Sequence, residues 1–144
     1  MNKRALSERD ICTKFITPAL VAAGWDVQLH VREEVTFTKG RVIVRGKLTA
    51  RGESKRADYI LYHSSGTALA LIEAKDNTHT VGAGMQQALG YAETLQIPFV
   101  FSTNGDAFLF HDRTLTEGGA DTVRRGVAAA DHDDMQPTGE DRLR

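Results

Sequence analysis

The chain has 144 residues, 41% of them hydrophobic and 26% charged, with a formal net charge of -1. Such a composition is typical of a globular domain and excludes a globally basic nucleic-acid-binding field. A single cysteine, Cys12, excludes a disulfide framework and a cysteine zinc cluster. No apolar run approaches the ~18 residues that span a bilayer, so we expect a cytoplasmic protein without a membrane partner.

The first predicted element is a helix over residues 7–24. Ser7 and Asp10 have the spacing of a capping box at its start. Pro18 interrupts the helical pattern. It predicts either a kink or a second short helix, with Thr17 as the cap and Pro18 at the first position.

Extended segments follow this helix. Residues 25–34 alternate between apolar and polar side chains, which predicts a strand with one solvent-facing side. Further strands are expected at residues 35–38, 41–50, 58–62, 68–75 and, around an Asn104-Gly105 turn, 98–112. Residues 81–97 have the pattern of a second helix. The order predicts an α/β fold of the α+β type, a mixed sheet flanked by helices.

The sequence changes character near Arg113. We expect one domain over residues 1–113 and a flexible tail over residues 114–144, with a short helix near residues 121–130.

The segment over residues 41–56 is rich in Lys and Arg. Its candidate phosphate-contacting side chains are Lys47, Arg51, Lys55 and Arg56. A solvated loop explains the same excess of positive charge, and the sequence leaves both interpretations open.

Two carboxylates and an ammonium stand on neighbouring predicted strands. Asp58 begins one strand, and Glu73 and Lys75 end the next, so a hairpin would bring the three together. Paired carboxylates repel unless a cation lies between them, and hard oxygen ligands favour Mg²⁺ or Mn²⁺. The alternative is a surface ion pair between Glu73 and Lys75, with Asp58 starting a turn. If the site holds a cation, replacing either carboxylate by alanine should leave the metal-free stability unchanged or slightly raised.

The stretches "RADYILY", "LIEAK" and "GMQQALGYAETLQIPFVFSTNGDAFLFHD" resemble the PD-(D/E)xK nuclease core. More narrowly, they resemble the N-terminal nuclease domain of type I restriction enzyme R subunits, over about residues 7–113. The resemblance implies a restriction-endonuclease-like core whose site contains Asp58, Glu73, Lys75, Gln87 and Tyr91. Glu8 best matches a further acid that the family's opening helix supplies. Gln87 and Tyr91 share one side of a helix, where an exposed Gln and a half-buried Tyr are the alternative.

The resemblance implies Mg²⁺-dependent cleavage of DNA, with Mn²⁺ as a substitute. It also implies three partners, namely specificity and methylation subunits and a helicase or translocase module. The chain lacks a Gly-rich phosphate loop ending in Lys-Ser/Thr, so we expect no ATP site in it. A truncated or excised chain is one interpretation. A non-catalytic docking or DNA-binding domain, or an inactive remnant, is the rival to a nuclease.

Overall fold

The computed structural model describes residues 2–38, 41–42, 54–115 and 122–124. Within them, one seven-stranded sheet has the order β2-β1-β3-β4-β5-β6-β7. Only the β4–β5 pair is parallel among these described strands. The strands are β1 (Val31–Thr38), β2 (Arg41–Val42), β3 (Lys55–Tyr62), β4 (Ala68–Ala74), β5 (Phe99–Thr103), β6 (Phe108–Asp112) and β7 (Thr122–Arg124). The predicted fold class, a mixed sheet with flanking helices, is confirmed.

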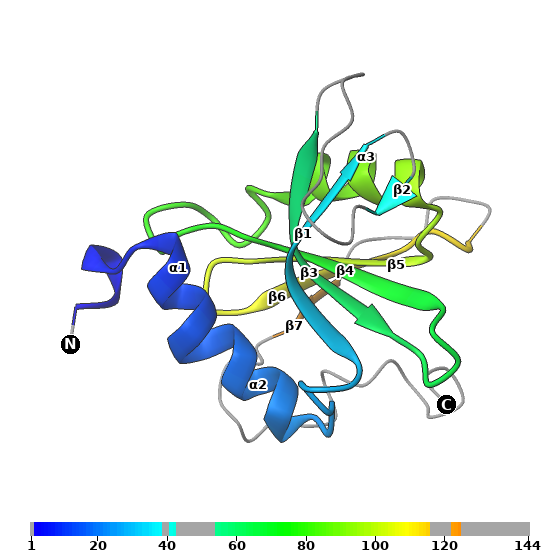
Figure 1. The fold of residues 1–144 in the computed structure, drawn as a ribbon. Coiled ribbons are helices and arrows are strands. Elements are labelled where there is room, and N and C mark those ends of the chain that lie inside the picture. The colour runs from blue at the N-terminus through cyan, green and yellow to red at the C-terminus, as the bar shows by residue number, and fades with distance from the viewer. Residues whose placement is uncertain (1, 39–40, 43–53, 116–121, 125–144) are drawn as a thin grey trace.

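Helices lie on both sides of this sheet (Figure 1). On one side are α1 (Glu8–Ile11), the π-helical segment η2 (Cys12–Ile16) and α2 (Thr17–Ala22), after the 3-10 turn η1 (Lys3–Ala5). On the other side is α3 (Met85–Leu95). Side chains alternate along a strand, so Tyr59 and Leu61 of β3 pack under α1 and α2, whereas Ile60 packs under α3. The sheet therefore separates two hydrophobic cores.

The N-terminal helix begins as predicted, and α2 is the second short helix of one predicted alternative, although Thr17 is its first residue and not its cap. Ser7 and Asp10 form the capping box. A π-helical segment precedes α2, and Pro18 lies in the first turn of α2. Pro18 has no N–H to donate to the preceding turn. The Thr17 N–H instead donates to the Cys12 carbonyl, five residues back.

The strand predicted over residues 25–34 is wrong over its first half. Residues 27–30 form turns, and β1 begins only at Val31. The Asp26 carboxylate accepts hydrogen bonds from the amides of Gln28 and Leu29, at 2.9 and 3.1 Å. This local side-chain bond competes with strand formation, and it leaves Leu29 72% exposed. Residues 35–38 are extended as predicted, as the second half of β1. Of the strand predicted at 41–50, Arg41–Val42 form β2 and the rest lies outside the described residues.

The strands at the centre of the sheet are connected as the sequence predicted. β3 and β4 form the antiparallel hairpin, and α3 connects β4 to its parallel neighbour β5. α3 begins at Met85, four residues later than predicted, and ends before Gln96, which has a left-handed φ of 59°. β4 and β5 occupy the middle of the sheet, so the carboxyl-terminal end of β4 opens beside the start of α3.

Past residue 113, the structure has a strand where the sequence predicted a helix. β7 pairs antiparallel with β6, so the prediction of a helix near residues 121–130 is wrong at 122–124. The remaining part of that prediction lies outside the described residues. None of the helices described is both long and apolar enough to cross a membrane.

Candidate active site

Asp58 of β3 and Glu73 of β4 are joined by reciprocal contacts across the hairpin. The Asp58 backbone N–H donates to Glu73 Oε2 at 3.0 Å, and the Ala74 backbone N–H donates to Asp58 Oδ2 at 2.8 Å. Glu73 is only 4% exposed, whereas Asp58 is half-buried. Each carboxylate therefore accepts a hydrogen bond from the opposite strand.

Burial and mutual repulsion perturb both acids. Desolvation, and next the charge of Asp58, raise the pKa of Glu73 to about 8. Burial also raises the pKa of Asp58, although its hydrogen bonds from Ala74 and Glu73 oppose this. In the absence of a cation, burial and repulsion therefore favour the protonated form of Glu73.

Lys75 extends from the end of β4 along the start of α3. Its backbone N–H donates to the Thr103 carbonyl at 2.9 Å, which continues the β4–β5 pairing. A Cβ added at Gly84 would lie 3.4 Å from Glu73 Cβ and 3.6 Å from Lys75 Cε, so both side chains face Gly84. The half-buried Lys75 makes no ion pair with another described residue. Its charge lowers the pKa of Asp58.

Gln87 and Tyr91 lie on the side of α3 nearest these acids. Gln87 Nε2 donates to the Tyr91 hydroxyl at 2.7 Å. The Tyr91 ring packs edge-on against Phe37 of β1, with ring centroids 5.0 Å apart. Burial and then the charge of Glu73 raise the pKa of Tyr91, which places its hydroxyl within electrostatic range of the carboxylate pair.

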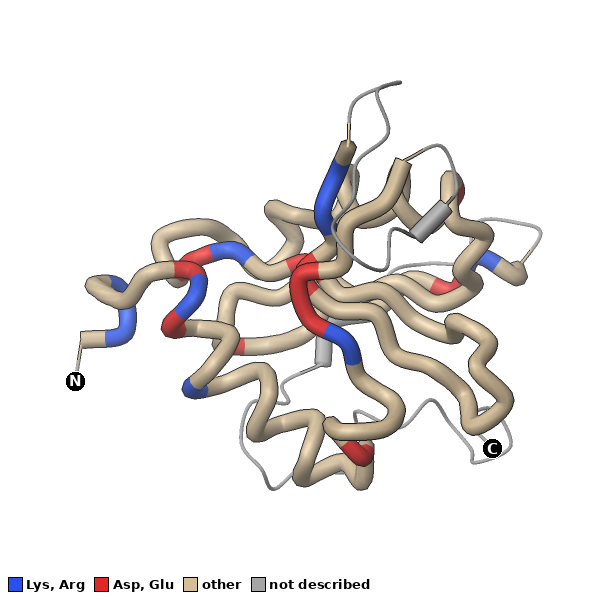
Figure 2. Tube along the Cα trace, in the orientation of Figure 1, with Lys and Arg blue, Asp and Glu red and all other residues tan. Residues whose placement is uncertain are grey.

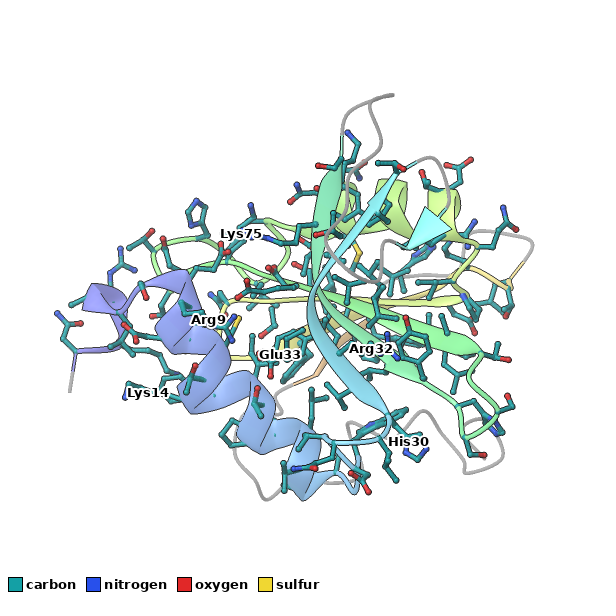
Figure 3. The ribbon with its side chains drawn as sticks, in the orientation of Figure 1. Arg9, Lys14, His30, Arg32, Glu33 and Lys75 are labelled. Carbon is teal, nitrogen blue, oxygen red and sulfur yellow. The ribbon has the colours of Figure 1, made fainter. Side chains whose placement is uncertain are left out.

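Glu8 approaches the same acids from the opposite layer. It begins α1 and is exposed, yet desolvation and then the charge of Asp58 raise its pKa. Lys75 acts on Glu8 in the opposite direction. Hydrogen bonds and electrostatic interactions therefore connect residues from α1, β3, β4 and α3 at the end of β4, where Figure 3 labels Lys75.

Sequence reasoning missed Asp76. Its carboxylate accepts hydrogen bonds from the Thr78 amide at 2.9 Å and hydroxyl at 2.5 Å, which lower its pKa to about 2. His79 Nδ1 lies 3.1 Å from the same carboxylate, and both groups act electrostatically on Glu8. The Asp-x-Thr spacing directly after Lys75 is a local turn signal that could have identified this acid.

Buried amides hold that loop against the sheet. Asn77 Nδ2 donates to the Asn104 carbonyl at 2.9 Å, and Asn104 Nδ2 donates to the His79 carbonyl at 2.7 Å. At the β5–β6 turn, Gly105 has a φ of +93°, and a Cβ there would lie 3.0 Å from Ile11 Cγ2. The "STNG" turn is therefore a structural support that contacts both the Lys75 loop and α1.

The basic segment is described only at its end. Lys55 and Arg56 begin β3 and are exposed, while Lys47 and Arg51 lie outside the described residues. Arg56 Nη1 lies 3.7 Å from Glu34 Oε1. Part of the local positive charge therefore faces a protein carboxylate.

An open pocket lies at the other end of β3 from Asp58. It has a volume of about 530 Å³ and is lined by Leu29, His30, Arg32, Tyr62, His63, Ser64 and Gly66. Arg32 stacks over the Tyr62 ring, 5.3 Å from its centroid. None of the predicted site residues lines this pocket.

Asp58 and Glu73 are the candidate ligands for a hard divalent cation at the end of β4. No group of three or more His, Cys, Asp or Glu side chains among the described residues has the arrangement of a ready metal site. Asp58 and Glu73 nevertheless bring two oxygen ligands together, and Mg²⁺ commonly binds through one or two carboxylates while keeping several waters. The buried pair with a raised pKa therefore fits such a cation, which would relieve its repulsion.

The fold and these residues define a mixed-sheet domain with an acidic pair and a lysine at the end of a central strand. The family model described as "Type I restriction enzyme R protein N terminus (HSDR_N)" matches residues 28–124. The chain belongs to this family and is an N-terminal R-subunit region.

Two individual comparisons agree with this assignment. The chain is 52% identical over 118 residues to the Type I restriction enzyme EcoAI endonuclease subunit of Escherichia coli. That match covers 82% of this chain and 15% of the relative. A solved fragment assigned to an HsdR subunit of a type I restriction enzyme from Vibrio vulnificus YJ016 aligns with a TM-score of 0.69 and 41% identity. It covers 84% of this chain and 23% of that chain.

Proposed function

We propose that this domain is a Mg²⁺-dependent endonuclease that cleaves DNA phosphodiester bonds as the nuclease part of a type I restriction R subunit. The observation that carries the proposal is the pairing of half-buried Asp58 with buried Glu73, beside Lys75 at the end of β4. A like-charge pair in this position is costly without a cation, so its presence favours a metal-dependent reaction over a docking role.

Each residue has a role in this proposal. Asp58 and Glu73 hold the cation, with Glu8 as a further ligand, and Mn²⁺ substitutes for Mg²⁺. A bound divalent cation stabilises charge on a phosphoryl oxygen and acidifies water. The Lys75 ammonium orients the attacking water or stabilises the charge developing on the phosphate. Gln87, Tyr91 and the basic residues before Asp58 contact the DNA backbone.

In this proposal, partner subunits direct the nuclease to its DNA target. The net charge of -1 gives no long-range attraction to DNA. The chain spans 15% of the length of its curated relative. Specificity and methylation subunits and an ATP-driven translocase module, as the family resemblance implies, are the proposed partners, in the cytoplasm. By itself the chain should bind DNA only weakly, with an affinity near the ~10⁻⁴ to 10⁻⁶ M of non-specific complexes.

Plasmid nicking by the 144-residue chain in Mg²⁺ or Mn²⁺, over a salt series, tests this function. We expect nicking without sequence preference at low salt, and little near ~0.15 M ionic strength, where charges are well screened. Glu73→Gln should abolish nicking. Glu93→Gln is the matched control, since Glu93 is an exposed acid towards the far end of α3. Equal nicking by Glu73→Gln and the wild type would exclude the proposed site, and nicking by neither would favour a docking domain or an inactive remnant.

A further inference from the structure

The hairpin pocket is the open space of about 530 Å³ lined by the start of β1, the turn before it and the β3–β4 hairpin. Its volume lies within the range of roughly 300–1,000 Å³ that small-molecule sites have. Figure 3 labels two of its lining residues, His30 and Arg32. No described Asp or Glu lines it, and residues 59–72 of the hairpin, tan in Figure 2, contain no Asp, Glu, Lys or Arg. Among the described lining residues, Arg32 therefore carries the one permanent charge, and the pocket favours an anion.

The Arg32 guanidinium is oriented by an aromatic ring and not by an acid. Its Cζ lies over the Tyr62 ring, 5.3 Å from the centroid. Such stacking uses the face of the guanidinium, while its N–H donors lie in the plane. Arg32 makes no ion pair with another described residue. The donors are therefore available to an anionic ligand, and a phosphate matches their fork geometry.

His63 offers a second donor from the hairpin. The Ser65 backbone N–H donates to His63 Nδ1 at 3.2 Å. A backbone N–H can only donate, so Nδ1 is the acceptor and the neutral ring carries its proton on Nε2. The His63 N–H donates to the Thr67 carbonyl and the Gly66 N–H to the His63 carbonyl, both at 2.8 Å. The hairpin therefore holds this imidazole in place with an N–H to donate.

Apolar surface adjoins these donors. Leu29 is 72% exposed in the turn before β1, and the half-buried Tyr62 supplies an aromatic wall. The Tyr62 N–H donates to the His30 carbonyl at 2.8 Å, which ties this turn to β3. Nucleic-acid bases stack on aromatic rings and on guanidinium planes alike. A nucleotide, which joins a phosphate to a flat base, therefore covers both the donors and the apolar surface.

We propose that the hairpin pocket binds a nucleotide, with its phosphate at Arg32 and His63 and its base against Tyr62 and Leu29. Four residues of β3 separate Tyr62 from Asp58, which is about 13 Å of strand. A nucleotide in this pocket is therefore distinct from one whose phosphate reaches the acid pair. Its binding needs no cation and does not rest on the proposed nuclease function.

Two sources supply such a nucleotide. One is a free mononucleotide, and the other is a single-stranded segment of DNA, in which the bases are exposed. Bases in duplex DNA are paired and stacked on one another, so a duplex should not place a base on Tyr62. The two sources share the same ligand chemistry, and separate probes distinguish them.

An NMR titration of the full chain with AMP, in chelator and without metal, tests the site. AMP should shift the amide signals of Tyr62, Ser65 and Gly66, which lie in or beside the pocket. Inorganic phosphate should bind at least about 5-fold more weakly than AMP, the low end of what stacking one base contributes. Adenosine should bind about 10-fold more weakly, because it lacks the charge-assisted hydrogen bonds of the phosphate.

Variants assign the binding to the named side chains. Arg32→Gln should weaken AMP about 10-fold, since it removes the charge and the fork. Arg4→Gln, which removes an exposed arginine of η1, should leave the affinity unchanged. Tyr62→Leu should weaken AMP about 5-fold or more, whereas Tyr62→Phe keeps the ring and should bind normally. Arg32 is exposed, so Arg32→Gln should fold normally and tests the site even if Tyr62→Leu is unstable.

A short single-stranded oligodeoxyadenylate identifies the source. Tighter binding than AMP, with shifts at the same amides and a loss in Arg32→Gln, would assign the pocket to single-stranded DNA. Binding no tighter than that of AMP would assign it to a free nucleotide. No shift at these amides with either probe would overturn the proposal, as would equal affinities of Arg32→Gln and Arg4→Gln. Phosphate binding as tight as that of AMP would also overturn it and leave a simple anion site.

Discussion

Asp58 donates its backbone N–H to the carboxylate of Glu73, 15 residues further along the chain. The Asp58 carboxylate in turn accepts a hydrogen bond from the Ala74 N–H. The two acids repel each other, and each is also hydrogen-bonded to the backbone of the opposite strand. These acids therefore have a structural and an electrostatic role at once, and substitutions can separate the two.

Glu73→Gln and Glu73→Ala should differ in stability. Charge alone predicts unchanged or slightly raised stability for either, but Glu73→Ala also removes the acceptor of the Asp58 N–H. That loss should cost about 1–3 kcal/mol in the free energy of unfolding. Glu73→Gln keeps an oxygen acceptor and removes the cost of protonating Glu73 on folding near neutral pH, so it should leave stability unchanged or raise it. Urea unfolding of metal-free protein near neutral pH measures both. Equal stability of the two variants would show that this hydrogen bond contributes nothing.

Stability of the metal-free domain should fall between pH 5 and pH 8. The folded-state pKa of Glu73 is raised to about 8 from its ordinary value of 4.5. Over that interval the folded state binds more protons than the unfolded state, so the free energy of unfolding decreases as pH rises. The slope from one group is at most about 1.4 kcal/mol per pH unit, and it should vanish below the unfolded pKa. Urea unfolding at several pH values should show the decline in wild type and a flatter curve in Glu73→Gln. Curves of equal slope would assign the pH dependence to other groups.

Lys75→Ala should slow cleavage while sparing Mg²⁺ binding. The ammonium lies beside the acids but donates no metal ligand, so its loss removes charge stabilisation in the reaction rather than affinity for the cation. Plasmid nicking and Mg²⁺ calorimetry on the same preparation separate the two effects. Lys14→Ala, which removes the charge of an exposed lysine in η2, provides the matched control. An unchanged nicking rate would remove Lys75 from the mechanism.

Tyr91→Phe should separate packing from polar contact on α3. The phenylalanine ring keeps the edge-on contact with Phe37, so the free energy of unfolding should change by less than about 1 kcal/mol. The hydroxyl that accepts from Gln87 is lost, and nicking should become slower with unchanged Mg²⁺ affinity. Wild-type nicking by Tyr91→Phe would favour the alternative of a half-buried structural tyrosine.

The sequence was sufficient for the parts of the site that depend on local periodicity. The hairpin of β3 and β4 follows from two apolar runs around a short polar loop, and strand alternation places Glu73 and Lys75 on one face. The helix that carries Gln87 and Tyr91 follows from its apolar stripe. Their roles in metal binding and catalysis stay predictions.

Sequence reasoning missed two kinds of feature: local side-chain hydrogen bonds that replace the expected strand, and ion pairs between residues far apart along the chain. The Asp26 side chain captures nearby amides and delays β1, which periodicity alone does not reveal. Arg9 contacts Glu33 and Glu34 of β1, where Glu34 has a left-handed φ of 52°, across a separation of 24 or 25 residues. No local pattern distinguishes these charges from an ordinary solvated surface.

Anomalous diffraction from a crystal soaked in Mn²⁺ tests the central claim most directly. Because both carboxylates lie at the end of β4, we expect an anomalous peak within about 2.0–2.6 Å of oxygens from Asp58 and Glu73, at hard-cation ligand distances. The peak should be absent in Glu73→Gln and retained in Glu93→Gln. A soaked wild-type crystal without a peak between Asp58 and Glu73, or with its peak elsewhere, would contradict the metal site on which the proposed nuclease depends.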